Sequence, residues 1–269
     1  MKLTAAAVTL GAVAAACGCA GQPPATTAPP TSAPPPGHAP SEHPAHAPSE
    51  HPAHGHAEPH PPSPRGEGTQ HGHHAATANH RFEDPERWAK VFDDPKRDAW
   101  QRPESVLDFL KLDASARVAD LGAGTGYFSV RLAKRVPQGK VYAVDIEPKL
   151  LEHLAQRAKQ AGLANVVTVL ASPDDAKLPS DLDLVLVVDT YHHISERVPY
   201  FEAVAKRLKP TGRLVIVDFR LGDLPVGPPD EHKISQDQAH TELEAAGFQL
   251  CGELKSLPYQ YVLSFGTTC

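Results

Sequence analysis

A strand, a glycine-rich turn and a helix follow one another in Val118–Phe128, which reads VADLGAGTGYF. The apolar residues before the turn are typical of a buried strand, and the glycines let a ligand lie directly on the backbone. The amides at Thr125–Tyr127 open a helix, whose N-terminus favours a carboxylate or a phosphate. This corner predicts a nucleotide-type ligand on an α/β fold. The glycines are Gly122, Gly124 and Gly126.

Strand signals alternate with helix signals along the chain. The run DLVLVVD at Asp183–Asp189 is almost uninterrupted apolar sequence, as expected of a parallel strand buried on both faces. The link Lys255–Tyr259 is too short for a helical crossover, so the last two strands must pair antiparallel. We therefore predict an α/β fold, a doubly wound, mostly parallel seven-stranded sheet with an antiparallel C-terminal strand pair. The predicted strands are Ala116–Leu121, Lys140–Asp145, Val166–Ala171, Asp183–Asp189, Arg213–Phe219, Phe248–Leu254 and Gln260–Phe265.

Helical periodicity fills the segments between these strands. An amphipathic entry segment, 81–112, precedes the first strand, with Asp84 as the N-cap of its first helix and Pro85 at the first helical position. We divide the chain into a signal segment 1–19, a linker 20–80, the entry segment 81–112 and a main domain 113–269. The predicted helices are Ser105–Leu112, Gly126–Val136, Pro148–Gly162, Glu196–Leu208 and Ser235–Gly247.

The glycine turn matches neither of two common nucleotide fingerprints. The dinucleotide pattern G-x-G-x-x-G needs a glycine where Tyr127 stands, and no Gly-Lys-Ser/Thr of a Walker loop occurs. Asp145 ends the second predicted strand, where a carboxylate can accept both hydroxyls of a ribose. Several cofactors share a glycine loop with such an acid.

Four segments, in the order in which they occur, indicate which of these cofactors the chain binds. DLGAGTG, VYAVDIEP, DLVLVVDTYHHI and LKPTGRLVIVDF closely resemble the class I S-adenosylmethionine-dependent methyltransferases, and the resemblance covers residues 100–269. That family also has an antiparallel terminal strand pair. The resemblance implies S-adenosyl-L-methionine as the cofactor, with no nicotinamide and no metal in the domain, and methyl transfer as the activity.

The resemblance also implies a role for each motif residue. Asp145 would bind the ribose, Ile146 would pack on the adenine, and Asp189 would lie beside the methionine amino group. Asp174 would bond the adenine amino group, although proline replaces the usual glycine before it and leaves Asp175 as an alternative. The residues of the first motif would cradle the methionine and ribose, and they are Asp120, Gly122, Ala123, Gly124, Gly126 and Tyr127.

Methyl transfer needs alignment of donor and acceptor, and a base only when the acceptor is protonated. Tyr191, His192 and His193 follow the fourth strand at the carboxyl edge of the sheet, so we expect them to face or flank the acceptor. A histidine with its ordinary pKa of about 6.5 could take a proton there. Alternatively, the histidines only pack beside the next helix, and catalysis is alignment alone.

The composition favours a small-molecule acceptor. Of 26 Lys and Arg and 32 Asp and Glu, only two basic and four acidic residues precede residue 81, so the domain is mildly acidic and unlike a nucleic-acid binder. Arsenite methyltransferases, which share the motif set, need several cysteines, and only Cys251 and Cys269 are present here. Whether these two form a disulfide stays open. The resemblance implies that Trp88, Phe92 and Trp100 belong to a lid over the cofactor.

The first residues resemble an export signal. An apolar run, Thr4–Ala16, follows Lys2, is too short to span a bilayer, and ends before Cys17. The pattern resembles a bacterial lipobox, which implies an exported protein that is lipid-anchored to a cell-envelope membrane through Cys17. The alternatives are an ordinary cleaved signal peptide and a mis-set start codon, the last of which would leave the protein cytoplasmic.

Residues 20–80 are rich in proline and histidine, and eleven of the 16 histidines lie in 38–80. So little apolar sequence cannot form a core, so we expect a disordered spacer. Neutral imidazoles could also bind divalent metal ions weakly there. Two other functions therefore stay open besides methyl transfer, a cofactor-binding module without catalysis and a metal-handling lipoprotein that acts through this tract.

Overall fold

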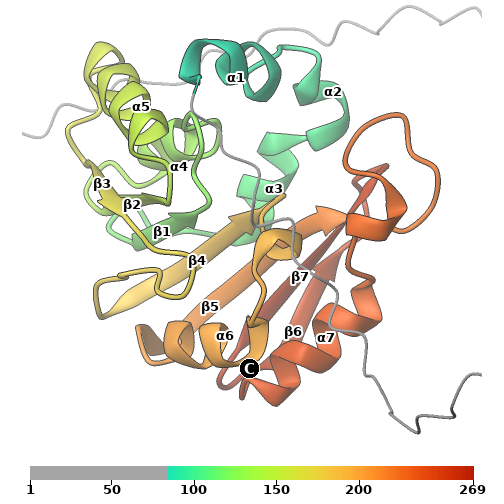
Figure 1. The fold of residues 1–269 in the computed structure, drawn as a ribbon. Helices are drawn as coiled ribbons and strands as arrows, with labels where there is room; N and C mark the ends of the chain where they lie inside the picture. Colours follow the sequence, from blue (N-terminus) through green and yellow to red (C-terminus); the bar gives the residue numbers. More distant parts are fainter. Residues whose placement is uncertain (1–83) are drawn as a thin grey trace, which may run out of the picture. The chain divides into compact units, whose positions relative to one another are not determined.

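The computed structural model describes residues 84–269, so Cys17, the signal-like segment and the histidine-rich tract lie outside the described residues. Figure 1 shows one sheet with helices on both sides. The strand order is β3-β2-β1-β4-β5-β7-β6. Among the described residues, no helix is long and apolar enough to cross a membrane. The strands are β1 Arg117–Leu121, β2 Lys140–Asp145, β3 Val166–Leu170, β4 Leu182–Val188, β5 Leu208–Phe219, β6 Gln249–Leu254 and β7 Gln260–Gly266.

The strand directions confirm the predicted topology. β1 pairs parallel with β2 on one side and with β4 on the other, and β4 pairs parallel with β5. β7 runs antiparallel to both β5 and β6. The doubly wound, mostly parallel α/β sheet with an antiparallel C-terminal pair is therefore confirmed. The chain leaves β1 toward one side for β2 and later returns to the other side for β4, which makes the ends of β1 and β4 a topological switch point.

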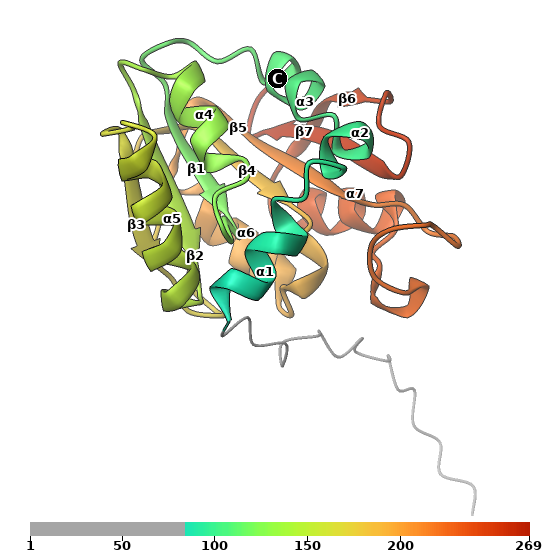
Figure 2. The same ribbon diagram turned by 90° about the horizontal axis from the view of Figure 1, so that it is seen from above.

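The helices form two layers over the sheet, as Figures 1 and 2 show. α3, α4 and α5 lie over one face, and α6 and α7 cover the other. The side chain of Asp84 caps the N-terminus of α1, as predicted. The side chain of Ser235 caps α7, which begins one residue later than predicted. The helices are α1 Pro85–Phe92, α2 Arg97–Gln101, α3 Pro103–Leu110, α4 Ser129–Arg135, α5 Pro148–Gln160, α6 Arg197–Ala205 and α7 Gln236–Ala245.

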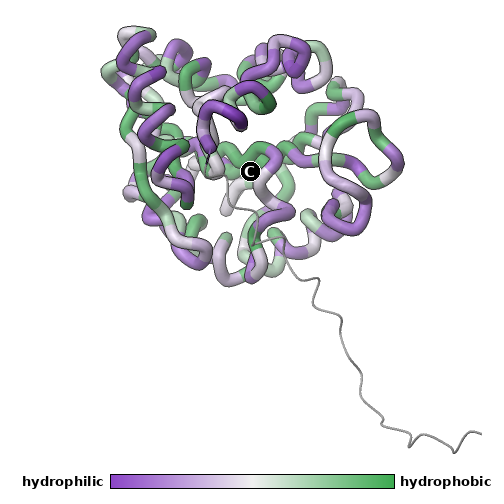
Figure 3. The backbone as a smooth tube through the Cα atoms, turned by 45° about the horizontal axis from the view of Figure 1, so that its top comes forward, coloured by the Kyte–Doolittle hydropathy of each residue, from purple (hydrophilic) through white to green (hydrophobic). Residues whose placement is uncertain are grey.

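β4 shows why this sequence gives a two-layer core. Its side chains alternate between the faces, with Leu184 and Leu186 packed on the α3–α4 side and Val185 and Val187 on the α6–α7 side. All four are fully buried, and each contributes about 1.5–3 kcal/mol relative to an exposed position. In Figure 3 the hydrophobic stretches lie in the middle of the domain, and hydrophilic ones mark the outer helices.

Three predicted boundaries were wrong by three residues or more. The helix predicted over Glu196–Leu208 ends at Ala205, because Leu208 already pairs with β4. β5 therefore starts at Leu208, before the predicted Arg213. Its pairing with β4 is irregular between these two residues, and Pro210 lies there, because a strand tolerates proline at such an irregularity. The helix predicted from Gly126 begins at Ser129, since turns fill the preceding residues. The short helix α2 was not predicted.

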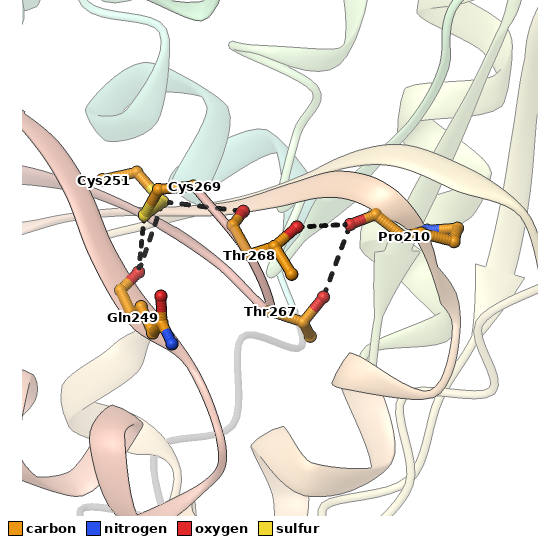
Figure 4. The surroundings of a disulfide bond; sticks show 6 residues. All are labelled: Pro210, Gln249, Cys251, Thr267, Thr268 and Cys269. Atoms are coloured by element: carbon orange, nitrogen blue, oxygen red, sulfur yellow. Dashed lines mark hydrogen bonds between the residues drawn. A yellow bond between two sulfur atoms is a disulfide. The ribbon is translucent and has the colours of Figure 1, made fainter.

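A disulfide joins Cys251 in β6 to Cys269, the pairing that the sequence left open (Figure 4). The hydroxyls of Thr267 and Thr268 donate to the carbonyl of Pro210 at 3.5 and 3.2 Å. The last residues of the chain are therefore fastened to β6 and to the start of β5, at the edge of the sheet where the parallel strands begin.

Candidate functional site

A cavity of about 260 Å³ opens at the carboxyl edge of the sheet, under the segment 84–102, which we call the lid. It lies at the switch point between β1 and β4, where open α/β sheets bind ligands. Phe92 of α1 and Arg97 of α2 form the lid side of its wall. Trp88 stacks on Phe92, with ring centroids 5.3 Å apart. Trp100 packs on Phe219 instead and does not line the cavity.

The glycine loop forms the floor of the cavity. Gly122 has φ +78°, and a Cβ there would lie 2.1 Å from the hydroxyl oxygen of Thr190, so only glycine fits. Ala123 and Gly124 also line the cavity, but Gly126 does not. Gly126 instead makes room for Leu154 of α5, since its Cβ would lie 2.8 Å from that side chain.

Asp145, at the end of β2, is held by the backbone. Its two carboxylate oxygens accept from the amides of Gly124 at 2.8 Å and Glu147 at 3.0 Å. Burial raises the pKa of this carboxyl, and the backbone hydrogen bonds act in the opposite direction. Each oxygen keeps an acceptor site after one such bond, so Asp145 can still accept two ligand hydroxyls.

Asp120, at the carboxyl end of β1, is almost completely buried and faces the same cavity. The hydroxyl of Ser129 donates to it at 2.5 Å. Burial raises the pKa of Asp120 to about 6, against the effect of the Ser129 bond. The floor of the cavity thus holds a carboxyl group with a pKa well above that of an ordinary aspartate.

A closed ring of polar side chains fastens the lid to Asp189. Arg97 donates to Asp189 at 3.0 Å and to Gln101 at 3.0 Å, Gln101 donates to Gln260 at 2.7 Å, and Gln260 donates to the other oxygen of Asp189 at 2.5 Å. The backbone of Asp189 is left-handed, with φ +52°. Burial raises the pKa of Asp189 to about 6, although Arg97 beside it acts in the opposite direction.

Tyr127 joins the glycine loop to the lid. The guanidinium of Arg97 lies 4.2 Å from the centre of its ring, and that of Arg131 lies 4.1 Å from it. Its hydroxyl donates to Asp98 of α2. Sequence reasoning missed Arg97 and α2, because the polar, twice-proline stretch 93–103 has no apolar periodicity to reveal a helix.

Of the three residues predicted to face the acceptor, only His193 lines the cavity. Tyr191 is fully buried, and its hydroxyl donates to Glu242 at 2.7 Å, which contradicts the expectation that it faces the acceptor. His192 is also buried and points to Asp218, with its Nδ1 2.8 Å from a carboxylate oxygen. The rings of the two histidines lie 4.2 Å apart.

The Asp218 carboxylate changes the acidity of His192. Burial alone would lower the pKa of His192, but Asp218 outweighs burial and raises the pKa above its ordinary value. The expectation of an unperturbed histidine at this position was therefore wrong. The backbone amide of His192 also donates to Asp218 at 3.1 Å, so this pair fixes the turn that presents His193.

Of the residues predicted to contact the adenine, only Ile146 lies at the cavity. Ile146 lines the cavity, as do Ser172 and Pro173. Asp174 does not line it; its carboxylate accepts from the hydroxyl of Ser172 at 2.7 Å, which lowers its pKa. Asp175 is no better placed, since it accepts from the amide two residues further on. Neither acid is in position for the predicted bond to adenine in this structure.

Thr125 in the glycine loop carries an unsatisfied group. Its side chain is 1% exposed, and its hydroxyl has no hydrogen-bond partner. A buried polar group without a partner costs about 1–3 kcal/mol. Thr125 lines the cavity, so a ligand with a polar group at the glycine loop would satisfy this hydroxyl.

A metal site in residues 84–269 would need several ligating side chains close together. No group of three or more His, Cys, Asp or Glu side chains there could hold a metal ion. The predicted weak metal binding concerns the tract 38–80, which the structure does not describe.

Comparison with known proteins gives consistent matches. A family model described as a methyltransferase domain matches residues 112–264. An uncharacterised methyltransferase of Mycobacterium bovis is 37% identical over 125 residues, which are 45% of this chain and 48% of that protein. The chain thus spans about half the length of the curated relatives that it matches.

Solved structures extend this similarity over the domain. A SAM-dependent methyltransferase from Aquifex aeolicus is 29% identical, with a TM-score of 0.64 over 68% of this chain and 97% of that one. Magnesium protoporphyrin IX methyltransferase from Synechocystis, solved with bound SAH, is 19% identical, with a TM-score of 0.54 over 68% and 93%. At that identity the second structure shares the fold alone.

Proposed function

We propose that this chain, which belongs to the methyltransferase-domain family, binds S-adenosylmethionine and transfers its methyl group to a small-molecule acceptor. The observation that carries the proposal is the cavity at the switch point, with the glycine loop and Asp145 on its wall. The similarity to the Aquifex methyltransferase, which spans nearly all of that protein, supports the same cofactor.

The cavity residues fit this cofactor. The Thr125 hydroxyl lacks a partner, and the glycine loop brings its backbone to the cavity. Asp145 would accept the ribose hydroxyls, and Ile146 would pack on the adenine. Arg97 and Asp189 offer opposite charges to the carboxylate and ammonium of the methionine part.

The charge of the cavity also suits a sulfonium ligand. Asp120, Asp145 and Asp189 all line it, with Arg97 as the basic side chain of the wall. Bound S-adenosylmethionine would supply the methyl group and the thioether leaving group. The chain itself would hold the acceptor in line and exclude water under the lid.

His193 is the residue that we assign to proton removal from the acceptor, because it lines the cavity. His192 would act through it as a positioning residue, since its contacts with Asp218 fix the turn. Where the acceptor is already deprotonated, alignment alone would suffice. A catalytically silent module would keep the cofactor contacts and show no turnover on any acceptor.

Calorimetric titration of the full-length protein with S-adenosylmethionine tests the cofactor assignment. Asp145→Asn should weaken binding about 10- to 150-fold, as expected for loss of charged hydrogen bonds worth about 1.5–3 kcal/mol. Asp174→Asn is the matched control, because this acid lies just outside the cavity and should leave the affinity unchanged. Equal affinities of Asp145→Asn and the unmutated protein would refute the ribose role.

We also propose export and lipid anchoring through Cys17, with residues 20–80 as a spacer. The disulfide supports this, since such bonds persist in oxidising compartments. Stable attachment would need the several acyl chains of a lipoprotein, because one chain anchors only weakly. An exported enzyme would depend on cofactor that leaves the cytoplasm. Palmitate labelling that survives Cys17→Ser would contradict the anchor.

Weak binding of divalent metal ions by the histidine tract 38–80 is a separate proposal. It rests on the eleven histidines of that segment. Zinc titration of a 20–80 peptide, compared with the full-length protein, tests it. A metal-handling function would be favoured over methyl transfer only if the protein bound zinc through this tract and failed to bind S-adenosylmethionine.

A further inference from the structure

The rest of the domain covers helix α1 only in part, and its aromatic side chains Trp88 and Phe92 are half-buried. None of its residues is buried, and Val91 is 56% exposed. The exposed charged residues of the helix are Glu86, Arg87 and Lys90, and the Arg87 guanidinium lies 5.5 Å from the centre of the Trp88 ring. Apolar and aromatic side chains mixed with basic ones on one short helix are typical of helices that lie in a membrane interface.

Three other exposed apolar side chains lie at the edge of the sheet that α1 covers. Ile146 follows β2 and Leu170 ends β3, and the pairing of Leu170 with Asp145 makes them neighbours. Leu221 lies two residues after β5 and is 53% exposed. Ile146 also lines the cavity, where the cofactor would cover it, so we call Val91, Leu170 and Leu221 the mouth rim. They are three of the six large apolar side chains exposed among the described residues.

The rest of the chain joins the domain at this rim. The residues before Asp84 lead directly into α1 and include the apolar run Thr4–Ala16 and Cys17. A chain anchored at Cys17 therefore connects to the domain beside the cavity mouth. The disulfide of Cys269 lies at the opposite edge of the sheet, near the start of β5.

We propose that the mouth rim rests on the lipid bilayer to which the chain is tethered, so that the acceptor is an amphiphile taken from that bilayer. This inference rests on the proposed anchoring and methyl transfer. Phe92 of α1 lines the cavity, and its ring lies beside Gly124. A shift of α1 on contact with lipid would therefore also move part of the cavity wall.

The two tryptophans of the chain, Trp88 and Trp100, both belong to the lid and report on this contact. Full-length protein carrying Cys17→Ser is mixed with vesicles of phosphatidylcholine and phosphatidylglycerol whose acyl chains bear bromine, a quencher of tryptophan within the bilayer. We expect quenching that unbrominated vesicles do not cause. Binding through residues 1–17 alone would not bring these tryptophans into the bilayer.

Val91→Glu in the same protein should lower the partition coefficient for lid quenching about tenfold, or about 1.4 kcal/mol. Leu250→Glu is the matched control, because Leu250 is also exposed but lies in β6, away from the rim. Absence of quenching, or equal quenching with Val91→Glu, would overturn the inference. A third result would also overturn it: no quenching, together with a dimer in sedimentation experiments that Val91→Glu dissociates, since the rim would then contact a second copy of the chain.

Titration of the same preparations with S-adenosylmethionine distinguishes failure of the bilayer contact from failure of the proposed function. Unchanged cofactor affinity without quenching would reject only the bilayer contact. Loss of cofactor binding in the unmutated protein would reject the proposed function itself. Val91 does not line the cavity, so its substitution should leave cofactor affinity in solution unchanged.

Discussion

Removal of the Cys251–Cys269 disulfide should lower the stability of the domain without altering its site. The bond links residues 18 apart. In the chain-entropy model a closed loop of this length stabilises the folded protein by about 3 kcal/mol, through restriction of the unfolded chain. For a domain of this size that corresponds to a fall in Tm of about 6–12 °C.

The assay is urea denaturation of the protein, oxidised and reduced, beside the double variant Cys251→Ala/Cys269→Ala. The reduced protein and the variant should share a lower midpoint. Their affinity for S-adenosylmethionine should match that of the oxidised protein, because the disulfide lies at the edge opposite the cavity. Equal midpoints with and without reductant would refute the reasoning, and so would a loss of cofactor affinity on reduction.

Three more predictions concern the site. Burial raises the pKa of Asp120 to about 6 from 3.8, so the folded protein binds more protons between these values, and stability should fall as pH rises from about 4 to about 6, by up to about 3 kcal/mol. Asp189, whose pKa burial also raises to about 6, adds a slope of the same sign, so Asp120→Asn should remove only the Asp120 contribution in urea titrations across this pH range. His193→Ala should lower the methyl-transfer rate about 10²- to 10⁴-fold at unchanged cofactor affinity. His192→Ala should also lower Tm, because the buried Asp218 carboxylate loses its imidazole partner. Full turnover in both variants would leave alignment as the whole mechanism. Tyr191→Phe should lower the free energy of unfolding by about 1 kcal/mol through loss of the hydrogen bond to Glu242. Because Tyr191 does not line the cavity, the variant's KM for the acceptor should stay unchanged, and a raised KM would contradict this assignment.

The fold could be predicted because its signals are local. The almost unbroken apolar run of β4 and the short link before β7 indicate a parallel centre and an antiparallel end of the sheet. The start of β5 could not be read in the same way. Pro210 normally stops a helix, and only the pairing of Leu208 with β4 shows that the strand has already begun.

The site was predictable where a motif places a side chain by its own backbone. Asp145 ends a strand beside the glycine loop, and its position follows from that loop. His192 and His193 are adjacent in sequence, and the sequence cannot say which of them faces the cavity. That choice depends on Asp218, which comes from a different strand. Arg97 lies in a stretch without apolar periodicity, and its partner Asp189 is 92 residues away, so the sequence shows neither its helix nor its ion pair.

The position of the last residue has a practical consequence for handling the protein. Cys269 is held beside β6 and the start of β5, at the opposite edge of the sheet from the lid. A purification tag or a surface linker added after Cys269 would leave the cavity mouth facing away from a solid support. An immobilised protein of that design would present its mouth to vesicles or to dissolved ligands. A fusion placed immediately before Asp84 would instead crowd α1.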